Sequence, residues 1–188
     1  METVNFLLGG LGGQGVLFMT KVLARTALNN ALDVMAAETH GMAQRGGSVV
    51  SHLKIGKMES SLVGTGSAHF LIALEENEAY RNIPFLASGG RMYANVSGNI
   101  FPRLEVKPYL ERIGVASHFM DAGNLAIELG ATMSSNLILL GFFSSFGEGP
   151  FSHEQLRAAI DQISPSRFRE INLKVFDAGF RWMKDESG

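Results

Sequence analysis

The sequence of 188 residues contains no cysteine. The chain therefore cannot form a disulfide, use a thiolate nucleophile, or bind zinc or an iron–sulfur cluster through thiolates. Any redox metal that works with this protein must lie on a partner. Long apolar runs are also missing, because the longest, Leu137–Phe143, is far shorter than the roughly 20 residues that span a bilayer. This excludes membrane insertion.

An excess of either charge is missing as well. Sixteen Lys and Arg residues against 18 Asp and Glu residues give a formal net charge of −2 and a pI near 6.2. This balance argues against nucleic acid as a partner. The amino-terminal segment has neither the basic start nor the cleavage pattern of a signal peptide, so we expect a cytoplasmic protein.

Enough apolar material is present for one hydrophobic core. Hydrophobic residues make up 46% of the chain and charged residues 18%, which excludes global disorder. No repeat, charge block or low-complexity linker divides the sequence. We expect a single α/β domain over residues 1–188, with helices packed on a mostly parallel sheet, although a mixed sheet fits the same pattern.

The amino-terminal half alternates short apolar runs with helical patterns. Val4–Leu8 is typical of a buried strand that stops at glycines, and apolar residues at three- and four-residue spacing from Gln14 to Asn30 predict a helix. With the next apolar run they predict a βαβ unit over residues 4–37. Further expected elements are strands at Leu32–Ala37, Ser48–Ile55 and Phe70–Leu74, a loop at Glu38–Gly47, and an acidic helix that begins near residue 75.

The carboxyl-terminal half ends in helices. Ser152 is a plausible N-cap for the amphipathic pattern that follows it, since a serine side chain can accept a hydrogen bond from the first helical turn. The expected strands are Met92–Val96, Glu105–Val106 and Val115–Met120. The expected helices are Gly123–Leu129, residues 133–146, His153–Ile163 and Ile171–Asp185.

A glycine-rich motif, GGLGGQG at residues 9–15, lies between the first expected strand and helix. It contains G-x-G-x-x-G at Gly10, Gly12 and Gly15, which is the pattern of a dinucleotide-binding turn. Glycine permits a positive φ, and the free N–H groups of the next helical turn favour an anion. Two interpretations stay open: a phosphate-binding turn, or a sharp turn whose glycines only allow close packing.

Glu38 follows Gly15 near the place where a dinucleotide-binding fold keeps its ribose-binding acid. One hypothesis is therefore a free-standing NAD(P)- or flavin-dependent dehydrogenase that uses the glycine motif and Glu38. The surrounding segment, ETHGMAQRGGSVVSH at residues 38–52, is dense in hydrogen-bonding groups. Arg45 in this segment has two interpretations. It binds a carboxylate or phosphate ligand, or it forms an ion pair with Glu38 that stabilises the loop.

Motifs for independent catalysis are missing. The five histidines do not have the spacing of metal ligands, and no nucleophile elbow, P-loop lysine or paired carboxylates are visible. We therefore assign no catalytic residue and no metal site from the sequence.

Four separated blocks together resemble the gamma-type subunit or domain of 2-oxoacid:ferredoxin oxidoreductases. They are GGLGGQGV at 9–16, ETHGMAQRGGSVVSH at 38–52, SSNLILLG at 134–141 and NLKVFDAGF at 172–180. The form HGMAQRGG is most similar to the beta subunit of the indolepyruvate enzymes. The resemblance runs in order from residue 4 to residue 180.

The resemblance implies the Rossmann-like fold of the gamma domain of pyruvate:ferredoxin oxidoreductase. It also implies a cluster-free subunit of a complex that converts a 2-oxoacid, of the indolepyruvate or aryl-pyruvate type, to acyl-CoA and reduces ferredoxin. Thiamine diphosphate and iron–sulfur clusters are then expected on larger partner subunits, with coenzyme A used by the complex. This chain, inactive alone, would support assembly and shape a passage for coenzyme A or substrate.

The matching blocks also supply candidate binding residues. They are Gly10, Gly12, Gly13, Gln14 and Gly15 near the first strand, Arg45, Gly46 and Gly47 in the second block, and Asn136 in the third. A third hypothesis is a scaffold whose glycine turn binds nothing. A second copy of the chain is a further candidate partner.

Overall fold

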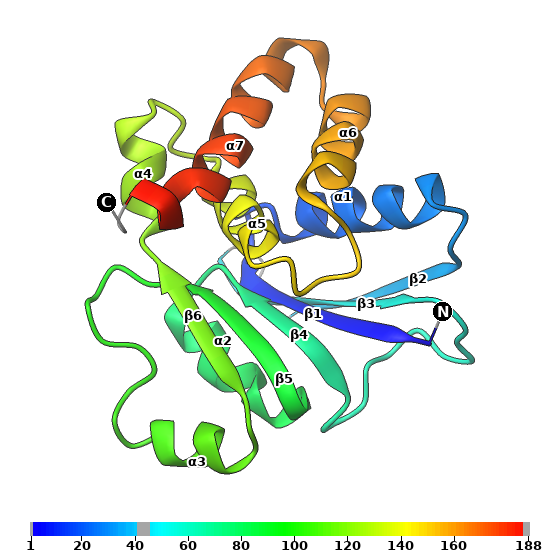
Figure 1. Cartoon of the computed structure of the whole chain (residues 1–188), viewed down its shortest axis with the longest axis vertical. Helices are drawn as coiled ribbons and strands as arrows, with labels where there is room; N and C mark the ends of the chain where they lie inside the picture. Colours follow the sequence, from blue (N-terminus) through cyan, green and yellow to red (C-terminus); the bar gives the residue numbers. More distant parts are fainter. Residues whose placement is uncertain (1, 41–45, 186–188) are drawn as a thin grey trace.

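Six strands form one sheet in the order β2-β3-β1-β4-β5-β6 (Figure 1). The computed structural model describes residues 2–40 and 46–185. The strands are β1 Val4–Leu11, β2 Val34–His40, β3 Ser48–Ile55, β4 Ala68–Ala73, β5 Leu86–Asn95 and β6 Ala116–Met120.

The sheet is mixed, because β3 runs against the other five strands. β1 pairs in parallel with β4 and antiparallel with β3, in a register that places Val4 opposite Ile55 and Leu11 opposite Ser48. β2 pairs antiparallel with β3 and lies at the edge of the sheet. The expected α/β class is confirmed, but β3 separates the two strands of the expected βαβ unit.

Helices cover both faces of the sheet (Figure 1). Side chains alternate across β1, so Phe6 and Leu8 enter the core under α1, α5, α6 and α7, whereas Leu7 enters the core on the face of α2 and α3. The helices are α1 Val16–Asn29, α2 Glu76–Asn82, α3 Lys107–Arg112, α4 Ala122–Glu128, α5 Ser135–Ser145, α6 His153–Ile163 and α7 Arg169–Asp185.

Most expected elements are confirmed. The strand expected at Met92–Val96 begins earlier, at Leu86, and three further expectations differ. β1 continues through its glycines to Leu11 because β3 pairs with its full length, and β2 extends to His40, so Glu38 lies in a strand rather than a loop. Glu105 and Val106 do not form a strand. They precede α3, whose first turn contains Pro108, a residue suited to a helix start.

The N-cap at Ser152 is confirmed as part of a capping box. Its hydroxyl accepts a hydrogen bond from the Gln155 N–H at 3.3 Å, and the Gln155 amide oxygen accepts one from the Ser152 N–H at 2.9 Å. Two otherwise unpaired donors at the start of α6 are thereby satisfied.

The helices α5 and α7 cross at two glycines. A Cβ atom on Gly141 would lie 2.0 Å from the carbonyl oxygen of Phe176, and one on Gly179 would lie 2.0 Å from that of Ile138. Only glycine therefore permits this backbone approach. Gly141 and Gly179 belong to the third and fourth blocks of the family resemblance, so these blocks include positions required for packing.

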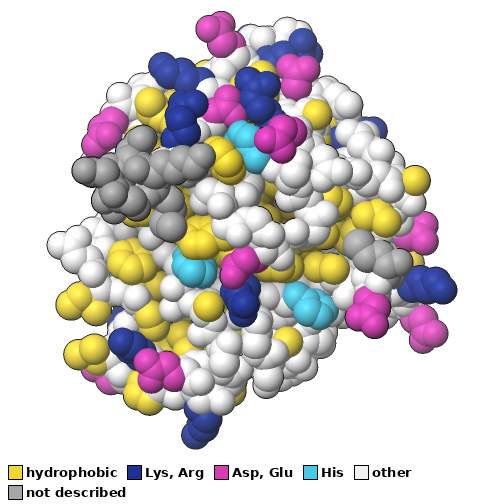
Figure 2. Space-filling model, viewed as in Figure 1, with side chains coloured by type: hydrophobic (Ala, Val, Ile, Leu, Met, Phe, Trp, Pro, Cys, Tyr) yellow, Lys and Arg dark blue, Asp and Glu magenta, His cyan; other side chains and the backbone are white. Residues whose placement is uncertain are grey.

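The visible surface mixes charges and apolar side chains. In Figure 2, basic side chains lie beside acidic ones over the helices, and hydrophobic side chains gather at the lower left. Exposed apolar residues of the segment after β5 are Ile100, Leu104 and Tyr109. Across residues 2–40 and 46–185, no helix combines the length and the hydropathy needed to cross a membrane.

Candidate functional site

The candidate site lies at the carboxyl end of β1, where residues 12–15 turn into α1. Gly13 has a φ of 98° and Gly15 a φ of 83°, values that residues with a side chain rarely adopt. Gly10 is different, because it lies within β1 opposite Val49. A Cβ atom there would lie 2.8 Å from Cγ2 of Val16, so Gly10 permits α1 to pack on the strand.

The glycine turn contacts the second block of the family resemblance. The Gly12 N–H donates a hydrogen bond to the Gly47 carbonyl oxygen at 2.9 Å, and a Cβ atom on Gly12 would lie 3.5 Å from the Gly46 nitrogen. Gly12, Gly46 and Gly47 are therefore brought together from segments more than 30 residues apart. Arg45 lies outside the described residues, so both interpretations of its role remain predictions.

Asn136 reaches the turn from α5. Its side chain is 6% exposed, and its amide nitrogen donates a hydrogen bond to the Gly15 carbonyl oxygen at 3.2 Å. A Cβ atom on Gly15 would lie 2.3 Å from that amide nitrogen. Gly15 is therefore required both for its backbone conformation and for its contact with Asn136. Asn136 holds the start of α1 against α5.

Both polar atoms of the Gln14 side-chain amide have hydrogen-bond partners. The oxygen accepts a hydrogen bond from the Leu11 N–H at 2.7 Å, and the nitrogen donates one to the Glu75 carboxylate. These contacts make Gln14 a brace within the turn, and its role as a candidate binding residue stays a prediction. The partner Glu75 was missed in the sequence, because an acidic residue near the start of a helix is ordinarily explained by the helix dipole.

Several backbone N–H groups of the turn are suited to an anionic ligand. Within the part of the chain that the structure describes, the N–H groups of Gly13, Gly15, Val16 and Leu17 donate no hydrogen bond. These four residues and Lys21, whose side chain is exposed, are among those that line a hollow of about 440 Å³. Free amide groups at a helix start and a lysine one turn further along can bind a phosphate or a carboxylate.

A second hollow, of about 320 Å³, adjoins the first through a shared residue, Phe18. Its lining includes Met133, Phe168 and Ile171, and Met133 is 77% exposed. Two adjoining hollows, both lined mainly by apolar surface, therefore lie beside the glycine turn.

The dehydrogenase hypothesis depends on Glu38, and the sheet order places this residue unfavourably. In a dinucleotide-binding fold the second strand lies directly beside the first. Here β3 lies between β1 and β2, and Glu38 pairs in register with Ser51 of β3. The acid is thus one strand spacing, roughly 4.8 Å, further from the glycine turn than a ribose-binding acid would be.

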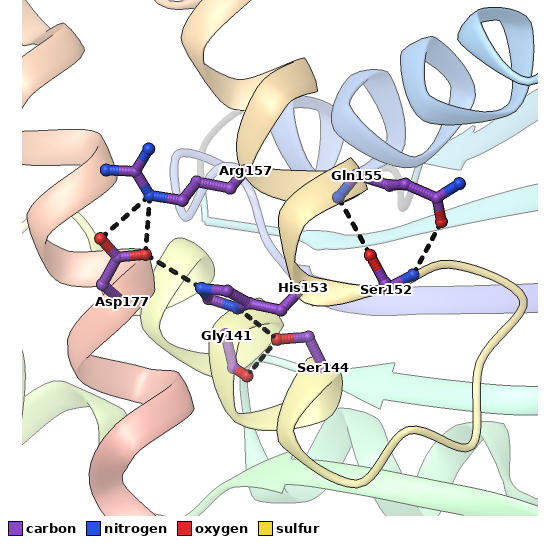
Figure 3. Close-up of polar contacts among 7 residues, drawn as sticks. All are labelled: Gly141, Ser144, Ser152, His153, Gln155, Arg157 and Asp177. Carbon is purple, nitrogen blue, oxygen red and sulfur yellow. Dashed lines mark hydrogen bonds and ion pairs between the residues drawn. The ribbon is translucent and has the colours of Figure 1, made fainter.

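A serine, a histidine and an aspartate meet elsewhere, between α5, α6 and α7 (Figure 3). His153 Nδ1 lies 3.1 Å from Ser144 Oγ, and His153 Nε2 lies 3.0 Å from Asp177 Oδ1. Ser144 also donates to the Gly141 carbonyl oxygen at 2.6 Å and is 7% exposed. Because a substrate has no access to a serine buried inside α5, the cluster joins three helices rather than forming a hydrolase site.

The electrostatics of this cluster agree with a structural role. Burial lowers the pKa of His153 below its ordinary value, while the hydrogen bond to Asp177 opposes that shift. Asp177 also accepts hydrogen bonds from Arg157 Nε at 3.0 and 3.1 Å (Figure 3). A neutral His153 that is protonated at Nε2 donates to Asp177, and the single hydroxyl proton of Ser144 is then shared between two acceptors, the Gly141 carbonyl oxygen and His153 Nδ1.

Comparison with known proteins gives the family. The sequence matches the family described as pyruvate ferredoxin/flavodoxin oxidoreductase over residues 5–182. The chain belongs to this family. The indolepyruvate oxidoreductase subunit IorB of Archaeoglobus fulgidus is 32% identical to this chain, and the match covers 94% of each chain. The resemblance to the indolepyruvate members is thereby confirmed.

Solved structures confirm the fold. The gamma subunit of a keto/oxoacid ferredoxin oxidoreductase from Geobacter sulfurreducens matches with a TM-score of 0.72 and 20% identity, covering 95% of this chain and 96% of that one. The 2-oxoglutarate:ferredoxin oxidoreductase of Magnetococcus marinus, solved with 2-oxoglutarate, coenzyme A and succinyl-CoA, matches with a TM-score of 0.78 and 17% identity. The match covers 98% of this chain but 32% of that longer chain.

Proposed function

We propose that this chain is the small, cluster-free subunit of a 2-oxoacid:ferredoxin oxidoreductase of the indolepyruvate or aryl-pyruvate type. The observation that carries the proposal is the similarity to the Archaeoglobus fulgidus IorB subunit along nearly the whole of both chains. The complex would oxidatively decarboxylate the 2-oxoacid to an acyl-CoA and pass the electrons to ferredoxin. The chain alone, as a single gamma-type domain over residues 1–188, would be inactive.

The cofactors that carry the redox chemistry are assigned to larger partner subunits. Thiamine diphosphate supplies the carbanion equivalent when it is bound, and iron–sulfur clusters carry electrons. The present chain has no cysteine with which to ligate a cluster. Among residues 2–40 and 46–185, no group of three or more His, Asp or Glu side chains is arranged to hold a metal ion.

The glycine turn is the place we propose for coenzyme A or substrate to pass. Gly12, Gly13, Gly15, Gly46 and Gly47 provide the close backbone approach. The N–H groups that have no acceptor among the described residues, together with Lys21, suit the phosphates of coenzyme A. Gln14 and Asn136 hold the turn, Gly10 lets α1 pack beneath it, and Arg45 is proposed to face the same anion. The Magnetococcus marinus enzyme, solved with coenzyme A, contains the same fold within a longer chain.

Co-expression with a large subunit that carries the thiamine and iron–sulfur motifs tests the assembly. We expect a stable complex that reduces ferredoxin with an aryl-pyruvate and coenzyme A, and no reduction by either subunit alone. Indolepyruvate should be preferred over pyruvate and 2-oxoglutarate. Reduction of an acceptor by the isolated chain, or micromolar binding of NAD(P) to it, would contradict the proposal.

Calorimetric titration of the complex with coenzyme A tests the binding site. Lys21→Ala should weaken binding several-fold, as expected for the loss of one cation beside a phosphate. Lys174→Ala removes an exposed lysine of α7 and serves as the matched control. Equal affinities of the two variants and the unchanged complex would exclude Lys21 from the site.

A further inference from the structure

Two carboxylates at the start of α2 each hold one of the two loops that form the candidate site. Glu75 directly precedes α2 and Glu78 lies in its first turn. Residues three apart lie on the same side of a helix, so both side chains can face the carboxyl edge of the sheet. Glu76, between them, instead pairs with Arg103 at 3.2 Å.

Glu75 contacts the glycine turn through Gln14. Glu75 occupies the N-cap position of α2, yet its side chain makes no capping hydrogen bond and accepts one from the Gln14 amide nitrogen. The Gln14 amide oxygen in turn accepts the Leu11 N–H at 2.7 Å. The carboxylate therefore fixes the rotamer of the side chain that closes the turn.

Glu78 contacts the start of β3. Its carboxylate accepts a hydrogen bond from the Ser48 hydroxyl at 2.6 Å and pairs with Arg81 Nε at 3.2 Å. The Glu78 side chain is 3% exposed, and its Cβ would lie 3.6 Å from a Cβ atom on Gly9. Ser48 directly follows Gly47, the residue whose carbonyl oxygen receives the Gly12 N–H. The carboxylate thus holds the second loop where it meets the first.

Such support is needed because glycines have little preference for any one backbone conformation. Ordering them costs more conformational entropy than ordering other residues, and a site built from them must be held by its neighbours. Asn95 adds to this support from β5, since its amide nitrogen donates to the Leu74 carbonyl oxygen at 3.2 Å, next to Glu75.

We propose that Glu75 and Glu78 are positioning residues of the candidate site, Glu75 for the glycine turn through Gln14 and Glu78 for the Gly46–Gly47 loop through Ser48. The inference deepens the proposed function, and its activity readout rests on that function. The hydrogen-exchange readout does not depend on the proposed function, because hydrogen exchange is measured on the isolated chain.

Amide hydrogen exchange of the isolated chain, followed by mass spectrometry, tests Glu75 first. Glu75→Ala should raise the exchange of the peptide that contains Leu11, Gly12 and Gln14 by roughly tenfold, as expected when a charge-assisted hydrogen bond is lost. Glu75→Gln keeps an acceptor oxygen and should restore most of the protection. Unchanged exchange in Glu75→Ala would overturn the role of Glu75.

Glu78 is buried, so its replacement risks unfolding the chain. Ser48→Ala removes the same hydrogen bond and leaves Glu78 paired with Arg81. It should raise the exchange of the peptide around Gly47 and Ser48, with a smaller effect at Gln14. Glu76→Ala is the matched control and should leave both peptides unchanged. Equal effects of Ser48→Ala and Glu76→Ala would overturn the role of Glu78.

The assembled complex provides the functional test. Glu75→Ala should raise KM for coenzyme A several-fold with little change in kcat, and Glu75→Gln should restore KM. If exchange rises but KM does not, Glu75 positions the turn while the turn does not bind coenzyme A, and the passage in the proposed function fails instead. If neither changes, the positioning role itself is wrong.

Discussion

The glycine turn and the crossing of α5 and α7 use the same residue type for opposite purposes. At the crossing, Gly141 and Gly179 are required because a side chain would collide with a backbone carbonyl oxygen. At the turn, a Cβ atom on Gly13 would meet none of the described residues within 4 Å, and the requirement for glycine seen there is a φ of 98°. Gly13 therefore differs from Gly141 and Gly179, and also from its neighbour Gly15, whose Cβ atom would lie 2.3 Å from the Asn136 amide nitrogen.

The difference shows that a family signature marks more than the functional site. The first two blocks of the resemblance meet at the Gly12 to Gly47 hydrogen bond beside open space. The last two blocks meet at the helix crossing, and only Asn136 of the third reaches the turn. A match in all four blocks therefore reports the fold as strongly as it reports the chemistry.

The largest expected effect is at the crossing. Gly179→Ala would place Cβ 2.0 Å from the Ile138 carbonyl oxygen, so α5 and α7 must separate. We expect the free energy of unfolding to fall by about 3 kcal/mol or more, measured by urea denaturation. Gly98→Ala, whose Cβ would have its nearest neighbour at 3.9 Å, should change it by less than about 0.5 kcal/mol. Similar losses in both would remove the distinction.

A smaller loss of stability is expected at the turn. Gly13→Ala forces an L side chain to a positive φ without a collision, so the free energy of unfolding should fall by about 1–2 kcal/mol. The same urea denaturation measures it. A loss as large as that of Gly179→Ala would show that the turn is packed as tightly as the crossing and would break the comparison.

The smallest effect concerns the pH dependence of the free energy of unfolding. It depends on His153 of α6, which contacts Ser144 of α5 and Asp177 of α7 near the helix crossing. Burial lowers the pKa of His153 in the folded chain, so the unfolded chain takes up the proton first as the pH falls below the ordinary value of 6.5. The stability is therefore fully present above that pH and is lost progressively below it. Unfolding measured at pH 7.5 and pH 5.5 should show a smaller difference for His153→Gln than for the unchanged chain.

Two other histidines contribute in the same direction. Burial lowers the pKa of His52 and of His118 as well, so some pH dependence should remain in His153→Gln. An unchanged difference between the two pH values in that variant would assign the whole effect to those two residues and remove the crossing from the explanation.

Local sequence patterns predicted most of the helices and strands, because these patterns arise from interactions between residues a few positions apart. The strand Ser48–Ile55 and the Ser152 N-cap follow from alternation and from capping chemistry within a few residues. The position of β3 between β1 and β2 could not be predicted this way, because strand order depends on pairing between distant segments.

The candidate site was predicted in part: its glycines were found in the sequence, but the side chains that support them were not. The glycines of the turn are visible as a motif, and the resemblance includes them with Gly46 and Gly47 among the candidate binding residues, which the hydrogen bond from Gly12 to Gly47 brings together. The braces Glu75 and Glu78 were missed, since a carboxylate that reaches across a sheet edge to Gln14 or Ser48 has no spacing rule in the sequence. Gly10 was placed in the turn because the motif cannot show how far β1 continues.

The reversed direction of β3 has a consequence for insertions and deletions. Gly46 and Gly47, in the connection between β2 and β3, directly precede Ser48, so a change of length there would disturb the hydrogen bond from Gly12 to Gly47. A single residue deleted inside β3 would turn its side chains to the opposite face and carry the Ser48 hydroxyl away from α2. Homologous chains should therefore be constant in length along this strand.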